Sequence, residues 1–157
     1  MTGGSKTFTV REATPSDRPA ILAIAEDLPE WFDEHARQVA IPTDIVHQHV
    51  SVALEGPLVV GFISLYVSDG RLNIGWIGVL KSHHRKGIGH QLLRTAEERA
   101  RAMGVAEIAV STLGDAVEYA PYDQTRSFYR KNGFVAYQRS KTDNPGCPEE
   151  LKLRKQL

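Results

Sequence analysis

The sequence has little cysteine, no excess of either charge and no long hydrophobic run. Its single cysteine, Cys147, cannot form an internal disulfide, so we expect a reducing environment and a cytoplasmic protein. The 19 Lys and Arg residues equal the 19 Asp and Glu residues in number, and no global field therefore favours nucleic acid or a membrane surface as a partner. No apolar segment approaches the roughly 20 residues that a membrane-spanning helix needs.

Length and composition predict one globular domain. The chain has 157 residues, of which 41% are hydrophobic and 24% charged, and both values are ordinary for a protein with a buried core. No internal repeat or long linker divides it. Residues 1–6 lack an apolar signal core and are expected to form a disordered tail, while residues 7–157 are expected to form the single domain.

Hydrophobic periodicity and turn residues predict a mixed α/β fold. Asp69-Gly70 is typical of a two-residue hairpin turn between two strands. The predicted order is a strand at 8–11, helices from about 15 to 28 and from 42 to about 50, strands at 51–54, 58–67 and 71–79, a helix at 88–103, a strand at 107–112, a helix carrying 125–131, and strands from 134 and near 151–153. This order gives a mixed, mostly antiparallel sheet with helices on both faces.

Two helices carry further local signals. Thr14-Pro15-Ser16-Asp17 predicts a start in which Thr14 is the N-cap and Asp17 closes a capping box. Gly104 predicts the end of the helix at 88–103. That helix is expected to bury one face and to pair two outward charges, with Ile88, Leu92, Ala96, Ala100 and Met103 on the buried face and Glu97 and Arg101 as the pair.

The most informative stretch is a basic turn between the strand at 73–79 and the helix that begins at Ile88. It reads His84-Arg85-Lys86-Gly87-Ile88-Gly89, and we call these six residues the anion cradle. Gly87 and Gly89 let the backbone approach a ligand closely, and the helix N-terminus offers N–H groups to an anion. Arg85 and Lys86 add two cations. The pattern predicts a phosphate site, although a tight strand-to-helix loop would give the same spacing.

Two common phosphate-binding motifs do not fit the anion cradle. A P-loop requires G-x-x-x-x-G-K-[ST], and a dinucleotide fingerprint requires a third glycine where Gln91-Leu92 stands. The cradle instead resembles the pyrophosphate motif [QR]-x-x-G-x-[GA] of the GCN5-related N-acetyltransferase (GNAT) superfamily. His84 departs from the usual Gln or Arg of that motif, which affects the side-chain contact but not the backbone contacts.

A second motif strengthens the resemblance. Residues 125–134, Thr-Arg-Ser-Phe-Tyr-Arg-Lys-Asn-Gly-Phe, resemble the second signature of the superfamily, a short helix that carries Phe-Tyr and ends in Gly-Phe. The asparagine that usually precedes that tyrosine by seven residues is replaced by Tyr122. The resemblance covers essentially the whole chain, from Arg11 to the basic C-terminal strand.

The resemblance implies an N-acetyltransferase that takes the acetyl group from acetyl-CoA and passes it to an amine. It implies pantetheine contacts from the backbone of Ile77, Gly78 and Val79, and pyrophosphate contacts from the whole anion cradle and from His90. Tyr129 matches the tyrosine that donates a hydrogen bond or proton to the departing thiolate, and core packing beside Phe128 is its alternative role. Trp31 and Phe32 stand where relatives shape the acceptor pocket, and they are equally consistent with core packing.

The general base and the acceptor are left open by the sequence. The glutamate that many relatives use aligns here with Asn73, which cannot accept a proton. Alternatives are a water chain, the small free-base fraction of the amine, or one of five loop residues, namely Glu30, Asp33, His35, Glu118 and Asp123. The acceptor can be a small molecule or a protein, and a homodimer is compatible with the family.

Two further expectations complete the functional prediction. His47 and His49 are two residues apart and form no ligand pattern, so no metal site is expected. Direct attack of the amine is favoured, because the signature region offers no serine or cysteine beside a base. A rival hypothesis is an acyl-CoA-binding module with little or no catalysis, which the substitutions at His84, Asn73 and Tyr122 motivate.

Overall fold

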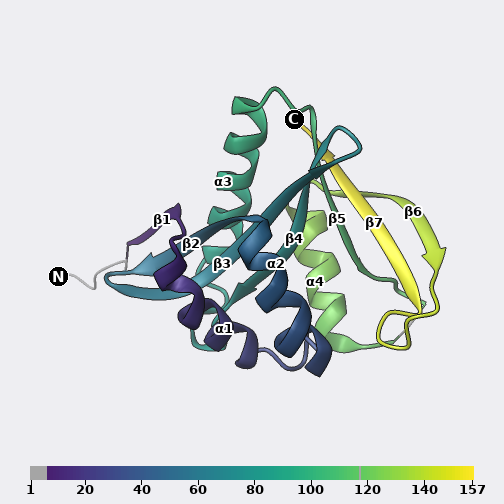
Figure 1. Cartoon of the computed structure of the whole chain (residues 1–157). Helices are drawn as coiled ribbons and strands as arrows, with labels where there is room; N and C mark the ends of the chain where they lie inside the picture. The colour runs from purple at the N-terminus through teal and green to yellow at the C-terminus, as the bar shows by residue number, and fades with distance from the viewer. Residues whose placement is uncertain (1–6, 117) are drawn as a thin grey trace. The chain divides into compact units, whose positions relative to one another are not determined.

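The computed structural model describes residues 7–116 and 118–157. Its helices and strands occur in the predicted order (Figure 1): β1 (Phe8–Glu12), α1 (Arg18–Glu26), α2 (Ile41–His47), β2 (His49–Glu55), β3 (Leu58–Ser68), β4 (Arg71–Val79), α3 (Ile88–Ala102), β5 (Glu107–Leu113), α4 (Ala120–Lys131), β6 (Val135–Lys141) and β7 (Glu149–Gln156). The tail predicted for residues 1–6 lies outside the described part of the chain.

The strands form a mixed sheet with the order β1-β2-β3-β4-β5-β7-β6. The pairs β1–β2, β2–β3, β5–β7 and β6–β7 are antiparallel, and β4–β5 is parallel. The predicted fold class, a mixed and mostly antiparallel sheet with helices, is thereby confirmed. By their contacts the residues divide into two compact units, the first made of residues up to Leu65 with Gly75–Thr95 and the second of Tyr66–Ile74 with Ala96–Leu157.

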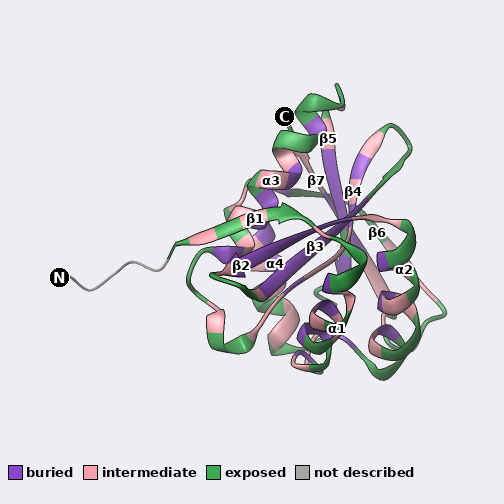
Figure 2. Ribbon diagram, turned by 60° about the vertical axis from the view of Figure 1, so that its left-hand side comes forward, coloured by how far each residue is buried: buried purple, intermediate pink, exposed green. Residues whose placement is uncertain are grey.

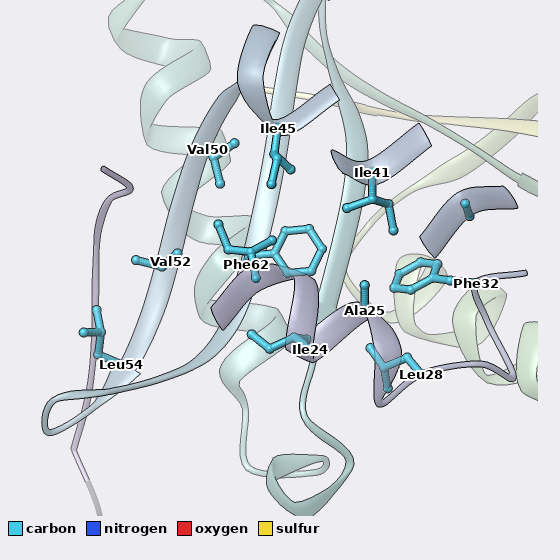
Figure 3. Packing of buried hydrophobic residues seen from close by; sticks show 12 residues of the cluster. Ile24, Ala25, Leu28, Phe32, Ile41, Ile45, Val50, Val52, Leu54 and Phe62 are labelled. Carbon is cyan, nitrogen blue, oxygen red and sulfur yellow. The ribbon is translucent and has the colours of Figure 1, made fainter. Parts of the chain in front are cut away.

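The first unit buries helices against both faces of its strands. In Figure 3, Ile24 and Ala25 of α1, together with Leu28 just after the helix, lie in one apolar cluster with Phe62 of β3. The neighbouring residue Gly61 faces the other way, because successive strand residues point to opposite faces. A Cβ placed on Gly61 would lie 3.3 Å from Ile88 and 3.4 Å from Leu92 of α3. Strands β2 and β3 are accordingly buried over most of their length (Figure 2).

The entry into α1 follows the predicted capping pattern. The Thr14 N–H donates to the Asp17 carboxylate at 2.8 Å, and Pro15 opens a short 3-10 turn, η1 (Pro15–Asp17), that leads into α1. Arg11 of β1 donates to the same carboxylate at 2.7 Å. These bonds anchor the end of β1 to the start of the helix.

The second helix begins earlier and ends earlier than predicted. A π-helical segment, η2 (Ala36–Ala40), runs directly into α2, and Val50, expected near the helix end, belongs to β2. The Asp33 carboxylate accepts the Ala36 N–H at 2.8 Å, at the start of the π segment. Pro42 lacks an N–H and is therefore typical of a helix start, but here the wider π turn before it lets a longer helix continue through it.

The hairpin between β3 and β4 confirms its sequence signal. Asp69 and Gly70 both have positive φ angles, 55° and 71°. Positive values at both central residues define the type I′ turn, whose twist matches that of the flanking strands.

In the second unit, two predictions for α3 and one for α4 differ from the structure. Met103 is 45% exposed, because the helix ends at Ala102 and Gly104 then turns the chain with φ 73°. Glu97, which was predicted to pair with Arg101, forms its ion pair with Lys155 of β7 instead. Helix α4 already begins at Ala120, with Pro121 in its first turn, whereas irregular chain was expected up to residue 123.

Among the described residues, no helix combines the length and the apolar character that crossing a membrane requires. Within the same residues, no group of three or more His, Cys, Asp or Glu side chains converges as metal ligands would.

Candidate active site

The anion cradle has the backbone of a ligand-binding turn. After η3 (Lys81–His83), His84 is extended, Arg85 has φ 62° and Gly87 has φ 80°. Positive φ is uncommon for a residue with a side chain, so Arg85 has an unusual backbone conformation. A Cβ on Gly87 would meet no atom within 4 Å, and the positive φ, rather than crowding, is what favours glycine there.

Helix α3 presents its N-terminal end to this turn. The Gln91 N–H donates to the Gly87 carbonyl at 3.0 Å, which is the first α-helical bond. The N–H groups of Ile88 and Gly89 precede it and have no carbonyl within the helix to bond. Together with the positive end of the helix dipole they favour an anion. Arg85 and Lys86 are exposed beside them, and His90 is exposed in the first turn.

The side chain of His84 turns back toward the end of β4. Its Nε2 lies 2.7 Å from the Val79 carbonyl oxygen, and its ring stands edge-on to the Trp31 ring with 5.7 Å between the centroids. A carbonyl oxygen only accepts, so Nε2 carries the proton in this bond. The sequence showed that His84 departs from the family motif, but it gave no signal for this pair of contacts.

The glycines of β4 lie at close approaches between elements. A Cβ on Gly78 would lie 3.0 Å from Phe62 and 3.1 Å from Leu28. A Cβ on Gly75 would lie 2.2 Å from Gln48 Oε1 and 2.9 Å from Ser64 Oγ. The Trp76 N–H donates to the same Ser64 hydroxyl at 2.9 Å, so a side chain takes the place of a strand carbonyl here. Close approach of neighbouring elements therefore accounts for both glycines.

The three β4 residues assigned to the pantetheine arm differ in exposure. Gly78 is buried against the core, whereas Ile77 and Val79 are partly exposed. The Leu80 N–H donates to the Val60 carbonyl at 2.9 Å, which keeps the end of β4 in the sheet. Ile77 and Val79 are therefore the more accessible residues of this segment.

Trp31 and Phe32 have different surroundings. Phe32 is 8% exposed, belongs to the apolar cluster (Figure 3) and stands edge-on to Trp76 with 5.6 Å between the ring centroids. Trp31 is only partly buried and contacts His84 of the anion cradle. Of the two roles the sequence allowed, core packing describes Phe32, whereas Trp31 lies at the surface of the cluster beside the cradle.

The candidate bases of the first unit are engaged or exposed. Glu30 is paired with the Lys81 ammonium, whose hydrogen bond holds the pKa of Glu30 below its usual range. Asp33 accepts the Ala36 N–H, and His35 is exposed. A lowered pKa makes Glu30 a poorer proton acceptor at neutral pH.

In the second unit, Asn73 and Asp123 also have partners. The Asn73 amide donates to the carbonyls of Ser68 and Arg71 at 3.2 and 3.1 Å, which stabilises the hairpin. Asp123 is ion-paired with Arg126, and Glu118 is exposed.

Tyr129 lies on α4 in an aromatic and apolar environment. It is 3% exposed, and its ring lies 5.4 Å from those of both Phe128 and Phe134. Burial raises the pKa of Tyr129 well above its usual value, because the phenolate would lose hydration. The hydroxyl therefore stays protonated and able to donate.

A buried arginine in the same helix escaped the sequence prediction. Arg126 is 2% exposed and donates to the Leu113 carbonyl at 2.6 Å, in addition to its pair with Asp123. A buried guanidinium is rare unless it is paired. The i,i+3 spacing of Asp123 and Arg126 was the available signal.

Comparison with known proteins identifies the family. The profile described as "Acetyltransferase (GNAT) domain" matches residues 46–136, more than half of the chain. A curated relative, the aminoalkylphosphonate N-acetyltransferase of Salmonella typhimurium, is 33% identical over 112 residues, which cover 66% of this chain and 73% of the relative. The chain belongs to the GNAT acetyltransferase family.

Solved structures of GNAT proteins share its fold. A GNAT-family acetyltransferase from Desulfovibrio desulfuricans has a TM-score of 0.81 at 21% identity, over 96% of this chain and 99% of that chain. A GNAT-family acetyltransferase from Elizabethkingia anophelis, solved with acetyl-CoA bound, has a TM-score of 0.71 at 19% identity, over 96% of this chain and 98% of that chain. The predicted family, fold class and acyltransferase activity are confirmed, and acetyl-CoA is the co-substrate of GNAT enzymes.

Proposed function

We propose that the protein transfers the acetyl group of acetyl-CoA to the amine of a small acceptor by direct attack. The observation that carries the proposal is the anion cradle, in which left-handed Arg85 and Gly87 lead into the N-terminus of α3. A helix end with two exposed cations beside it suits the pyrophosphate of a coenzyme A derivative.

The proposed donor site continues from the cradle along β4. The N–H groups of Ile88 and Gly89 would bind the pyrophosphate, with Arg85, Lys86 and His90 around them. The pantetheine arm would pair with the backbone of Ile77 and Val79. The buried position of Gly78 keeps one face of this strand packed against the core.

The proposed reaction forms an amide and releases coenzyme A. The neutral amine attacks the thioester carbonyl carbon, the carbon–nitrogen bond forms, and the electron pair of the breaking carbon–sulfur bond leaves with sulfur. A backbone N–H would stabilise the oxyanion as charge develops. The Tyr129 hydroxyl would donate a hydrogen bond to the departing thiolate, and the proton released by the new amide nitrogen finally converts this thiolate to the thiol of coenzyme A.

Two observations support direct attack rather than an acyl-enzyme. Burial raises the pKa of the Cys147 thiol, which disfavours the thiolate form that a nucleophile requires. The thiol also donates to the Glu149 carbonyl at 3.4 Å, so it is held in a structural contact. Since the candidate bases are engaged or exposed, the amine is proposed to react from its free-base fraction or through water.

The acceptor class is proposed from the relative. The Salmonella typhimurium protein is named for aminoalkylphosphonates, and 33% identity over 66% of this chain makes short amines with an anionic group the first acceptors to test. Protein N-termini, a homodimer and a cytoplasmic location stay predictions.

The test has two steps. Acetyl-CoA binding is measured by calorimetric titration, and release of the coenzyme A thiol is then measured in the presence of aminoalkylphosphonates and a broad panel of other amines. Micromolar binding with amine-dependent thiol release supports the proposal. Absence of binding would overturn it. Tight binding without thiol release on any amine would instead favour the rival acyl-CoA-binding module.

A further inference from the structure

The loop that follows α1 contacts both η3 and the anion cradle. The Lys81 N–H donates to the Asp27 carboxylate at 2.8 Å, and the Lys81 ammonium pairs with Glu30. The Trp31 and His84 rings meet edge to face at an interplanar angle of 79°. The chain between α1 and η2 is therefore fastened to η3 by a hydrogen bond and an ion pair, and to the anion cradle by a ring contact.

The peptide group between Val79 and Leu80 is held at both ends. Its N–H, on Leu80, donates to the Val60 carbonyl of β3 at 2.9 Å. Its carbonyl, on Val79, accepts from His84 Nε2 at 2.7 Å. A peptide group is planar, so two bonds on opposite sides fix the orientation of the whole plane. This plane ends β4, the strand proposed to carry the pantetheine arm.

We infer that His84 is a positioning residue that fixes the Val79–Leu80 peptide plane and seats the Trp31 indole before acetyl-CoA binds. The inference rests on the proposed function, because it assigns a role within the same donor site. His84 thus acts through the backbone of Val79 rather than by touching phosphate. Its ring adds a contact that a glutamine or arginine at this position cannot make in the same way.

The two contacts of His84 can be separated by substitution. His84→Gln keeps an N–H donor for Val79 and loses the aromatic edge that faces Trp31. His84→Phe keeps a ring but has no N–H, so the Val79 carbonyl loses its hydrogen bond from this side chain. His84→Ala loses both. His47→Gln is the matched control, because His47 is exposed in the last turn of α2.

The first measurement is the Kd of acetyl-CoA for each variant by calorimetry. We expect His84→Gln and His47→Gln to stay within about twofold of the wild type, and His84→Phe and His84→Ala to bind about tenfold more weakly, a change on the scale of one hydrogen bond. The indole emission of the free protein should shift in His84→Gln and His84→Ala and change least in His84→Phe, because only that variant keeps a ring beside Trp31.

A second measurement needs neither a ligand nor a variant. Nitrogen-15 correlation spectra of the wild-type imidazoles should show His84 protonated on Nε2, since only that nitrogen can donate to Val79. A neutral His84 protonated on Nδ1 alone, or a His84→Phe protein that binds acetyl-CoA as tightly as the wild type, would overturn the inference. If the wild type itself fails to bind acetyl-CoA, the proposed function falls first, and this inference falls with it.

Discussion

Arg126 and Leu113 are joined by a hydrogen bond between a buried guanidinium and the main chain. Arg126 Nη1 donates to the Leu113 carbonyl at 2.6 Å, and the arginine is only 2% exposed. The bond ties α4, which carries Tyr129, to the last residue of β5. The charge is balanced by the Asp123 carboxylate, which is itself exposed.

Replacing this arginine should destabilise the protein. Arg126→Met leaves a carbonyl without its donor and Asp123 without its cation, so we expect a loss of about 2 kcal/mol in the free energy of unfolding. Urea titration followed by circular dichroism measures it. Arg130→Met, at a half-exposed arginine of the same helix, is the control and should change stability by less than about 0.5 kcal/mol. Equal effects of the two substitutions would contradict the role given to Arg126.

Removing the Tyr129 hydroxyl should reduce turnover without unfolding the protein. Tyr129→Phe keeps the ring packing against Phe128 and Phe134, and we expect kcat to fall about a hundredfold, the scale for loss of one transition-state hydrogen bond. Steady-state release of coenzyme A and a thermal melt measure the two effects. If kcat of Tyr129→Phe is unchanged, Tyr129 has a packing role only.

The pH dependence provides a second check on Tyr129. Burial raises the pKa of its phenol above the usual value of 10, so the donor remains protonated throughout the ordinary assay range. The pH–rate profile of the wild type should therefore show no alkaline decline from this residue below about pH 10. A decline near pH 8 to 9 that disappears in Tyr129→Phe would be inconsistent with this environment.

Gly87 of the anion cradle can be tested against Gly56, a glycine outside the cradle where alanine would introduce a similar backbone strain. Both have positive φ, 80° and 56°, and a Cβ on either would meet no atom within 4 Å. Gly87→Ala and Gly56→Ala should each cost about 1 kcal/mol of stability, because an L-residue disfavours the left-handed region. Only Gly87→Ala should weaken acetyl-CoA binding in calorimetry. Equal binding by both variants would argue against a ligand at the cradle.

Asp17 should make folding sensitive to acid. Its hydrogen bonds from Arg11 and the Thr14 N–H hold the pKa of the carboxyl well below its unfolded value of about 3.9. A lowered folded-state pKa stabilises the protein above pH 4, and this stability is lost as the pH falls below that value. Compared with Asp17→Asn, the wild type should gain about 1 kcal/mol at pH 7, and the difference should shrink by pH 2.5. Asp143→Asn, in an exposed loop, is the control for urea titrations at both pH values.

Local signals predicted the elements well where one residue type decides the backbone. Asp69-Gly70 gave the hairpin, Asp17 the capping bond, and Gly104 the end of α3, because each depends on short-range geometry. The anion cradle followed from the same kind of signal, since Gly87 adopts the positive φ that its motif requires.

The remaining features depend on contacts that spacing does not encode. In the sequence, Pro42 reads as the start of a helix, although the π segment already precedes it. Proline is tolerated both in the first turn of a helix and directly after this π segment, so the sequence does not distinguish the two. The contact of His84 with Val79 and the burial of Arg126 arise from side chains that bend toward a carbonyl, and any of several rotamers would have satisfied the sequence pattern. Phe32 and Trp31 are adjacent in sequence, yet only the fold shows that one is in the core and the other beside the cradle.

The contrast between the two tryptophans gives the protein an intrinsic optical reporter. The chain has two tryptophans. Trp76 is anchored by its indole N–H to Asp44 at 2.8 Å and faces Phe32, whereas Trp31 lies beside the imidazole of the proposed donor site. Emission from Trp76 should therefore stay nearly constant on ligand addition, and the changing part of the signal should come from Trp31. Donor binding can then be followed in real time, on unlabelled protein and with any acyl-CoA.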